Sequence, residues 1–405
     1  MPGSELIVST QPSWGTNKAS LLLDKEYSFL SGGDPHRAVE LRLEDFQNVI
    51  GSEPLDAGAP PTANNVDKSN LHELRQPNGA LHDAKVNDTK EELNRIILNV
   101  HLPPAPSEAI EAPFNYISSL KSKGVRNLLI MALNTWISLD HAAIEWVVSL
   151  VADIHNTSLM LDDVQDNSPL RRSNPATHTV FGMPQTVNSS VYATVDLIHR
   201  ASEQGNAQAA QEVVVGMKKL LVGQSLDLLW TFEVSTPTFE EYMQMVDGKT
   251  GALFVMIYRI MVAVSPGQTV LPALERFTLL LGRYFQIRDD YANLASPDYS
   301  KAKGFCEDLD EGKCSFIMLH ALRNAQPASL TILRHLLLQR RSAGCAGLGH
   351  KEKMLAILQE TGSLKFTSEM LQQLHGSLVK ELKDLEQTFG VRNQLLHDVL
   401  EALRE

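Results

Sequence analysis

The chain has 405 residues, of which 43% are hydrophobic and 21% are charged, and its formal net charge is −12. This length fits two ordinary domains, or one large domain with an extension, and the composition is normal for a globular protein. The acidic balance argues against a general nucleic-acid binder, because no basic surface offsets it. The net charge does not exclude anionic substrates, since a local cluster of lysines and arginines can still bind them.

The three cysteines, Cys306, Cys314 and Cys345, form neither an even set nor a C-x-x-C pair. We therefore expect reduced thiols and a cytoplasmic location. The first residues lack a charged segment followed by an apolar core, so no signal peptide is expected. No run of about eighteen apolar residues occurs, so no transmembrane segment is expected either.

The first 88 residues differ in composition from the rest of the chain. Residues 1–50 mix short apolar and polar pieces, and residues 51–88 are rich in proline, glycine, asparagine and aspartate. Such a composition buries little apolar surface, so we expect an N-terminal extension and flexible linker over residues 1–88. A short amphipathic helix is predicted next, over residues 89–100, with Thr89 as its N-cap.

From about residue 107 onward, apolar residues recur at intervals of three and four in long segments separated by brief polar breaks. These segments are too long for strands and contain few alternating runs, so the pattern is typical of helices. We therefore predict an all-α fold, with a single helical domain over residues 89–405.

Three aspartates, Asp162, Asp163 and Asp166, lie together at the end of one apolar segment. Asp162 and Asp166 are four residues apart, so on a helix they share one face. The segment before them is apolar nearly all round, which is typical of a helix in the core of a bundle. A solvated helix end would explain single acids, but three clustered carboxylates repel each other and need a compensating cation.

A second apolar segment ends in the same way, with Asp289, Asp290 and, one turn later, Asn293. Two acid-tipped helices in one bundle predict carboxylates that face each other across a cavity. All-oxygen ligands of this kind suit Mg²⁺, which keeps some water ligands and commonly bridges to substrate phosphates. No H-E-x-x-H or C-x-x-C pattern suggests zinc instead.

Basic residues flank both acidic clusters. Any one of them alone is an ordinary surface charge, but metal ions combined with bidentate arginines and point-charge lysines are what a diphosphate site needs. The flanking residues are Lys123, Arg126, Arg171, Arg172, Lys249 with the adjacent hydroxyl of Thr250, Lys303 and Lys313.

The two acidic motifs, D-D-V-Q-D followed by R-R and D-D-Y-A-N, resemble those of the trans-isoprenyl diphosphate synthases. The segments KGVR, HNTSLMLDD, GQSLDLLW, GKTG and KGFCEDLDEGKCSF match further motifs of that family in order and spacing. Within the family, the chain is most similar to eukaryotic, in particular fungal, geranylgeranyl diphosphate synthases and to the prenyltransferase part of fungal bifunctional terpene synthases. Gln165 and Ser173 stand where many relatives carry glutamate and glycine.

The resemblance implies an isoprenoid-synthase-type helical bundle around a deep central cavity, in a homodimer or larger homo-oligomer. It implies three Mg²⁺ ions held by Asp162, Asp166 and Asp289, with Asp163 and Asp290 in support. These five aspartates and Lys249 are the implied catalytic residues. The residues implied to bind the allylic diphosphate are Arg171, Lys249, Thr250, Gln286, Asn293, Lys303 and Lys313. Those implied to bind isopentenyl diphosphate are Lys123, Arg126, His155 and Arg172.

The implied reaction is Mg²⁺-dependent chain elongation, in which isopentenyl diphosphate condenses with an allylic diphosphate. We expect geranylgeranyl diphosphate for terpene biosynthesis, because Thr157 and Ser158, about one turn before Asp162, are too small to stop a growing chain early. A longer product such as geranylfarnesyl diphosphate, a class I terpene cyclase and a non-catalytic subunit are the alternatives. A cyclase would normally replace the second acidic motif with an N-D-x-x-S-x-x-x-E helix, which the sequence lacks.

Two further expectations concern His155 and the partners. A histidine in a buried helix is usually a hydrogen-bonded core residue, but the position of His155 seven residues before Asp162 matches a substrate contact of the family. The expected macromolecular partner is a terpene cyclase, either covalently linked or separate.

Overall fold

The structure, a computed structural model, describes residues 90–102, 104–121, 124–203, 207–295 and 305–404. Its contacts divide the chain into two units, Met1–Leu102 and Pro103–Glu405. In the first unit, residues 90–98 form a helix whose side chains are all exposed. Thr89 and the expected extension and linker over residues 1–88 lie outside the described residues.

The second unit is built from helices, and the predicted all-α fold is confirmed. Its helices are α4 (Glu108–Ser119), α5 (Val125–Ile137), α6 (His141–Asp166), α7 (Thr177–Phe181), α8 (Met183–Glu203), α9 (Ala207–Glu233), α10 (Phe239–Val246), the π-helix η2 (Asp247–Gly251), α11 (Ala252–Val264), α12 (Pro272–Ala295), α14 (Glu307–Glu311), α15 (Phe316–Asn324), α16 (Pro327–Ala343), α17 (Leu348–Glu360), α18 (Ser363–Phe389) and α19 (Gln394–Ala402). In the described part of the chain, the strands are β1 (Leu170–Arg171) and β2 (Asn174–Pro175).

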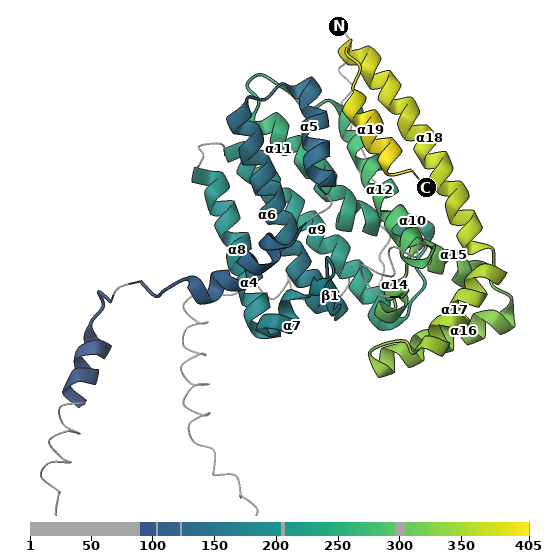
Figure 1. The fold of residues 1–405 in the computed structure, drawn as a ribbon, viewed down its shortest axis with the longest axis horizontal. Helices are drawn as coiled ribbons and strands as arrows, with labels where there is room; N and C mark the ends of the chain where they lie inside the picture. The colour runs from purple at the N-terminus through teal and green to yellow at the C-terminus, as the bar shows by residue number, and fades with distance from the viewer. Residues whose placement is uncertain (1–89, 103, 122–123, 204–206, 296–304, 405) are drawn as a thin grey trace, which may run out of the picture. The chain divides into compact units, whose positions relative to one another are not determined.

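Two long helices, α6 and α12, carry the acidic motifs. Figure 1 shows them in the bundle, where α6 packs against α8, α9 packs against α11, and α12 packs against α11 and α18. The helix α6 begins at the N-cap Asp140, whose side chain accepts a hydrogen bond from the backbone of Ala143 at 2.8 Å. It ends at Asn167, which adopts the left-handed conformation. The first acidic motif therefore stands on the last turn of a helix that is anchored at both ends.

A two-stranded hairpin follows α6 and carries the paired arginines. The strands run antiparallel, with Arg171 opposite Asn174. Between them, Arg172 and Ser173 have φ angles of 55° and 61°. These are left-handed values, which the favoured two-residue hairpin turns require and which glycine adopts most easily. Glycine would adopt the conformation of Ser173 with less strain.

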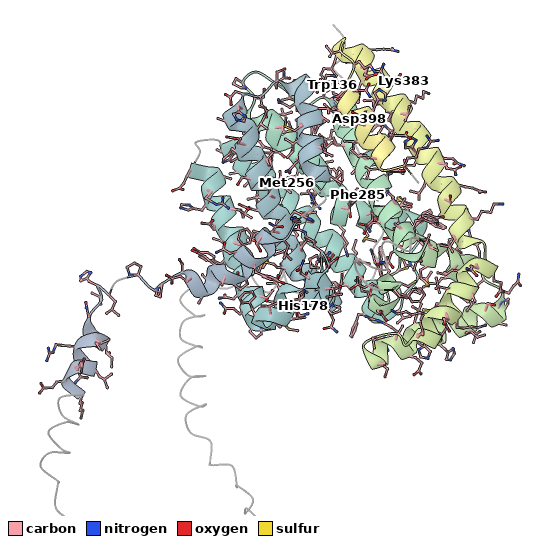
Figure 2. The ribbon with its side chains drawn as sticks, in the orientation of Figure 1. Trp136, His178, Met256, Phe285, Lys383 and Asp398 are labelled. Atoms are coloured by element: carbon pink, nitrogen blue, oxygen red, sulfur yellow. The ribbon has the colours of Figure 1, made fainter. Side chains whose placement is uncertain are left out.

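The C-terminal helices close one side of the bundle. The indole of Trp136 on α5 donates a hydrogen bond to the carbonyl of Val391 at 3.1 Å. The same indole stacks on Phe389, with ring centroids 4.6 Å apart and an interplanar angle of 9°. Figure 2 labels Trp136 next to these helices. The helix α19, which packs on α5, then brings Leu403 to the edge of the central cavity.

None of the helices in the described ranges has the length and apolar character needed to cross a membrane.

The link between α5 and α19 should contribute strongly to stability. Asn393 is buried, donates to the carbonyl of Ala132 at 2.8 Å and caps α19 by accepting from the backbone of Leu396 at 3.1 Å. We expect Asn393→Ala to lower the free energy of unfolding by roughly 1–3 kcal/mol, because it removes a cap and a buried hydrogen bond between α19 and α5. Denaturant titration followed by circular dichroism measures this change. Gln394→Ala, one residue later on the exposed surface, is the control, and an equal loss in both variants would contradict the prediction.

Candidate active site

The two acidic motifs meet at one cavity of about 560 Å³. Its walls come from α5, α6, α9, α11, α12 and α14, together with η2 and the hairpin. The predicted site residues that line it are Arg126, His155, Asp162, Asp166, Arg171, Arg172, Lys249, Thr250, Gln286, Asp289 and Lys313. Three others, Asp163, Asp290 and Asn293, are buried behind this lining. Lys123 and Lys303 lie outside the described residues.

In the first motif, Asp163 faces the protein interior. Its side chain is inaccessible to solvent, and Arg171 donates to its Oδ1 through Nε at 2.8 Å and through Nη2. The same Nη2 lies 3.4 Å from Oδ2 of Asp162. Burial alone would lower the pKa of Arg171, but the Asp163 carboxylate outweighs it and raises that pKa. Arg171 is therefore a fixed positive charge at the rim of the cavity.

Lys249 is held in a similar way by a carboxylate of α9. Its Nζ lies 2.6 Å from Oδ2 of the buried Asp227 and 3.6 Å from Oδ1 of Asp162. Burial would lower the pKa of Lys249, but the attraction of Asp227 and Asp162 raises it instead. Gln224, one turn before Asp227, donates to Asp162 at 3.2 Å. We did not assign Gln224 and Asp227 from the sequence, although their spacing in the segment GQSLDLLW places both on one helix face.

Asp166 is the aspartate of the first motif whose charged form is disfavoured by its surroundings. Its pKa is raised well above the usual value, first by burial and then by repulsion from Asp162, and Glu311 of α14 adds to the effect. A divalent cation between these carboxylates would remove this repulsion, and their oxygens are the donors that Mg²⁺ prefers. Over the described ranges, no three acidic, histidine or cysteine side chains are grouped closely enough to hold an ion by themselves. The donor set fits Mg²⁺ that completes its shell with water and phosphate oxygens.

In the second motif, Asp290 is the buried partner. Its carboxylate accepts hydrogen bonds from the hydroxyl of Tyr242 at 2.8 Å, Gln286 at 2.8 Å, Nζ of Lys313 at 2.9 Å and the backbone of Phe316 at 3.2 Å. Burial would raise the pKa of Asp290, but Lys313 outweighs it, so the pKa is lowered and the group is ionised. Asp290 therefore orients Lys313 and Gln286, both of which reach the cavity. Tyr242 had no signal in the sequence, because its partner is 48 residues away.

Two further contacts extend this network. The hydroxyl of Thr250 donates to Oε1 of Gln286, so the π-helix η2 is connected to α12 inside the cavity wall. Asn293 is buried and accepts from the backbone of Asp308 at 3.2 Å, which ties α12 to α14. Asp289 lies beside Asp290 in sequence but lines the cavity, together with Asp308 of α14.

A second group of cations gathers around His155. Arg172 donates to the carbonyl of Leu120 at 2.8 Å and to Asn156 at 3.1 Å. Burial lowers the pKa of Arg126 to about 10, and Arg172 adds to the effect. Burial and the arginines Arg126, Arg172 and Arg171 lower the pKa of His155, so its imidazole is neutral. Crowded arginines around a neutral imidazole form a place for an anion that is separate from the acidic motifs.

Small and apolar side chains form another part of the cavity wall. Thr157 and Ser158 both line it, and both of their hydroxyls donate to the carbonyl of Ile154 at 2.8 Å. Their polar atoms are thus satisfied by their own helix, and they present small side chains to the cavity. The apolar residues that complete the wall are Val125, Leu159, Leu161, Met217, Leu220, Leu221, Leu253, Phe254 and Phe285.

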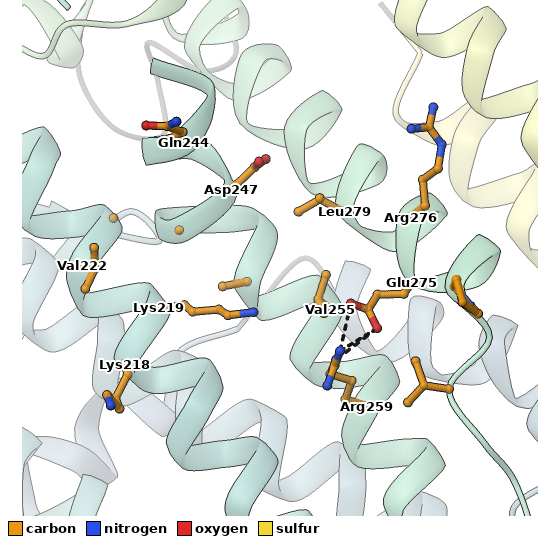
Figure 3. Close-up of a pocket in the computed structure, with 15 residues that line it drawn as sticks. Lys218, Lys219, Val222, Gln244, Asp247, Val255, Arg259, Glu275, Arg276 and Leu279 are labelled. Atoms are coloured by element: carbon orange, nitrogen blue, oxygen red, sulfur yellow. Dashed lines mark hydrogen bonds and ion pairs between the residues drawn. The ribbon is translucent and has the colours of Figure 1, made fainter. Parts of the chain in front are cut away.

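A larger depression of about 990 Å³ lies on the outer side of η2, between α9, α11 and α12 (Figure 3). It contains none of the predicted site residues. Within it, Arg259 pairs with Glu275 through contacts of 3.0 and 3.1 Å. This outer groove lacks paired acidic motifs, so the chemistry belongs to the smaller cavity.

Comparison with known proteins gives a consistent set of relatives. The family model described as polyprenyl synthetase matches residues 107–348. Geranylgeranyl pyrophosphate synthase A of Phomopsis amygdali is 50% identical over 314 residues, which are 77% of this chain and 80% of that protein. Talaropentaene synthase of Talaromyces verruculosus is 44% identical over 321 residues, 79% of this chain and 48% of that protein. A bifunctional sesterterpene synthase of Talaromyces wortmannii is 44% identical over 316 residues, 78% of this chain and 42% of that protein. The chain thus spans less than half the length of the last two.

The repulsion at Asp166 should be measurable as a stability difference. The folded protein raises the pKa of Asp166, so the metal-free chain loses stability as pH rises through that raised pKa. We expect Asp166→Asn to remove this loss and to raise the free energy of unfolding at neutral pH by roughly 0.5–1 kcal/mol. Denaturant titration in a chelating buffer, repeated at acidic and neutral pH, tests this. Asp227→Asn should instead destabilise the chain, because Lys249 loses its closest carboxylate. A gain in both variants would contradict this interpretation.

Proposed function

Since the chain belongs to the polyprenyl synthetase family and is a prenyltransferase, we propose that it condenses isopentenyl diphosphate with allylic diphosphates to make geranylgeranyl diphosphate. The main support is the convergence of Asp162, Asp166 and Asp289 with two groups of cations on a single cavity. One cavity with two places for anions suits two diphosphate substrates.

We propose that the allylic diphosphate binds at the acidic motifs. Asp162, Asp166 and Asp289 would hold Mg²⁺, which would supply positive charge to the diphosphate oxygens of the leaving group. The residues that would contact the diphosphate are Arg171, Lys249, Thr250, Gln286 and Lys313, with Lys303 predicted from the sequence. Asp163 and Asp290 would act by fixing Arg171 and Lys313. Asn293, which binds the backbone of Asp308, would act by holding α14 against α12.

Isopentenyl diphosphate would bind at the second group of cations. Arg126, Arg172 and His155 form this group in the described part of the chain, and Lys123 is added from the sequence. The neutral imidazole of His155 can donate one hydrogen bond without adding to the repulsion among the arginines. With both anions bound in this way, the isopentenyl double bond would lie beside the allylic carbon.

The proposed mechanism follows from where these charges lie. Arg171, Lys249 and Lys313 stabilise the negative charge that grows on the allylic diphosphate as its C–O bond breaks. The electron pair of the isopentenyl double bond attacks the allylic cation and forms the new C–C bond. A proton then leaves the adjacent carbon for the released diphosphate. The apolar wall excludes water, which would otherwise add to the cation.

The proposed product length rests on the wall of α6. Thr157 and Ser158 are small, which favours passage of the growing chain beyond fifteen carbons. The 50% identical relative is named as a geranylgeranyl pyrophosphate synthase, and this favours a twenty-carbon product. The similarity to a sesterterpene synthase keeps a twenty-five-carbon product as the second candidate.

The proposed partners follow from the relatives and the surface. Two relatives are about twice as long as the matched segment, so we propose that a terpene cyclase, linked or separate, uses the product. We also propose self-association, because large apolar side chains are exposed on neighbouring helices: Val191 and Val195 on α8, and Val222 and Phe232 on α9. The described cysteines are free thiols, in keeping with a cytoplasmic location.

Product analysis tests the activity. We expect the purified chain to convert dimethylallyl and isopentenyl diphosphates, in the presence of Mg²⁺, into geranylgeranyl diphosphate detected by mass spectrometry. A terpene cyclase would release no elongated diphosphate, and a non-catalytic subunit would consume neither substrate. A predominant twenty-five-carbon diphosphate would keep the reaction but overturn the assigned product.

The metal assignment is tested by removing two carboxylates. We expect Asp162→Ala with Asp166→Ala to lower turnover by a factor on the order of 10³ or more, with an unchanged helical circular dichroism signal. The control is Asp196→Ala, which removes a half-buried aspartate that pairs with Arg200 on the neighbouring helix α8 and does not line the cavity. Full activity in the double variant would defeat the assignment of Mg²⁺ ligands.

The proposed path of the growing chain is tested at Ser158. We expect Ser158→Phe to shift the product to fifteen carbons, because an aromatic ring would fill the cavity one turn below Asp162. Ser158→Ala keeps a small side chain and should keep the twenty-carbon product. An unchanged product in the phenylalanine variant would show that the chain grows along a different wall.

A further inference from the structure

The helix η2, which carries Lys249 and Thr250, faces the cavity on one side and the outer groove on the other. The π-helix η2 joins α10 to α11 and has the sequence DGKTG. Lys249 and Thr250 line the cavity, whereas Asp247 and Gly248 line the outer groove (Figure 3). A π-turn inside a longer helix is uncommon and is frequent at functional sites. The contacts of η2 with its neighbours α9 and α12 therefore set the direction in which Lys249 and Thr250 point.

Glycines bring η2 unusually close to its neighbours. A Cβ added to Gly248 would lie 2.8 Å from Cα of Gly223 on α9. A Cβ added to Gly282 on α12 would lie 2.7 Å from Cα of Gly251. Real Cβ atoms do not approach backbone so closely, so the first contact needs glycine at both 223 and 248, and the second needs glycine at 282. We name these two contacts, Gly223–Gly248 and Gly251–Gly282, the glycine crossing.

Two side-chain contacts fasten η2 to α12, one on each side of the crossing. On the outer side, Arg283 donates to both oxygens of Asp247, each at 2.6 Å. On the cavity side, Thr250 donates to Gln286, three residues further along α12. The helix α12, which also carries Asp289, thus contacts η2 on both its cavity side and its outer side. The outer pair is partly buried, and its bidentate geometry fixes the direction in which η2 faces α12.

We propose that the glycine crossing and the Asp247–Arg283 pair are positioning elements, which hold η2 in the register that aims Lys249 and Thr250 at the allylic diphosphate. This inference rests on the proposed function. A side chain added at the crossing would push η2 away from α9 or α12. Lys249 would then leave its positions 2.6 Å from Asp227 and 3.6 Å from Asp162. Displacements of about 1 Å at reacting groups can cost on the order of 100-fold in rate.

The crossing is tested by Gly282→Ala, with steady-state kinetics for both substrates and thermal unfolding. We expect kcat/KM for the allylic diphosphate to fall by about 10- to 100-fold, because the displaced groups bind that substrate. KM for isopentenyl diphosphate should stay unchanged, since Arg126 and Arg172 are not on η2. The control is Gly376→Ala on α18, where an added Cβ has no atom within 4 Å and both kinetic constants should be retained.

A second variant covers the case in which Gly282→Ala does not fold. Asp247→Asn breaks the outer pair without adding volume, and it should raise KM for the allylic diphosphate while leaving KM for isopentenyl diphosphate unchanged. Adding Arg283→Gln should cause no further loss, because the two residues act as one unit. Wild-type kinetics in every folded variant, or an equal rise of both KM values, would overturn the inference. Absence of product from the wild-type chain would instead overturn the proposed function on which it rests.

Discussion

Repulsion between carboxylates is the constraint on which the rest of this structure depends. Three helices, α6, α9 and α12, bring aspartates to the cavity or its wall, and each of three buried aspartates has a cation closer to it than any described cation is to Asp162. The pairs are Asp163 with Arg171, Asp227 with Lys249, and Asp290 with Lys313. Asp162, Asp166 and Asp289 line the cavity. The inner aspartates orient cations, and the outer ones line the cavity, where we propose that they bind Mg²⁺.

Helix geometry explains why the aspartates come as doublets. Neighbouring residues on an α-helix point about 100° apart, so one carboxylate of each doublet faces the cavity while the other faces the bundle. In the second motif, Asp290 fills its acceptor positions with protein donors, and this leaves Asp289 to the cavity. In each doublet, one aspartate therefore orients a cation and the neighbouring aspartate faces the cavity. The cost of burying the inner charge is offset by close and numerous donors.

The sequence was sufficient for the all-α fold and for the convergence of both motifs, because apolar periodicity and clustered acids are local signals. It was not sufficient for partnerships that only the tertiary structure creates. Tyr242 and Asp227 are single residues in helices of ordinary appearance, and their roles depend on neighbours from other helices. Asn293 shares the spacing of the second motif, yet it is buried and binds the backbone of Asp308. The left-handed turn at Arg172 was also beyond sequence reasoning, since arginine rarely adopts that conformation.

The hairpin turn at Arg172 bears on how product length can change during evolution. Arg171 and Arg172 are consecutive, yet the first binds the Asp163 carboxylate and the second reaches Asn156 and the carbonyl of Leu120. One peptide unit, whose length is covalently set, would thus span the two proposed anion subsites. Substitutions that deepen the apolar wall could lengthen the hydrocarbon space while the headgroups keep their spacing. Chain length and bond-forming chemistry would then be free to evolve separately, whereas an insertion in the hairpin would disturb both subsites at once.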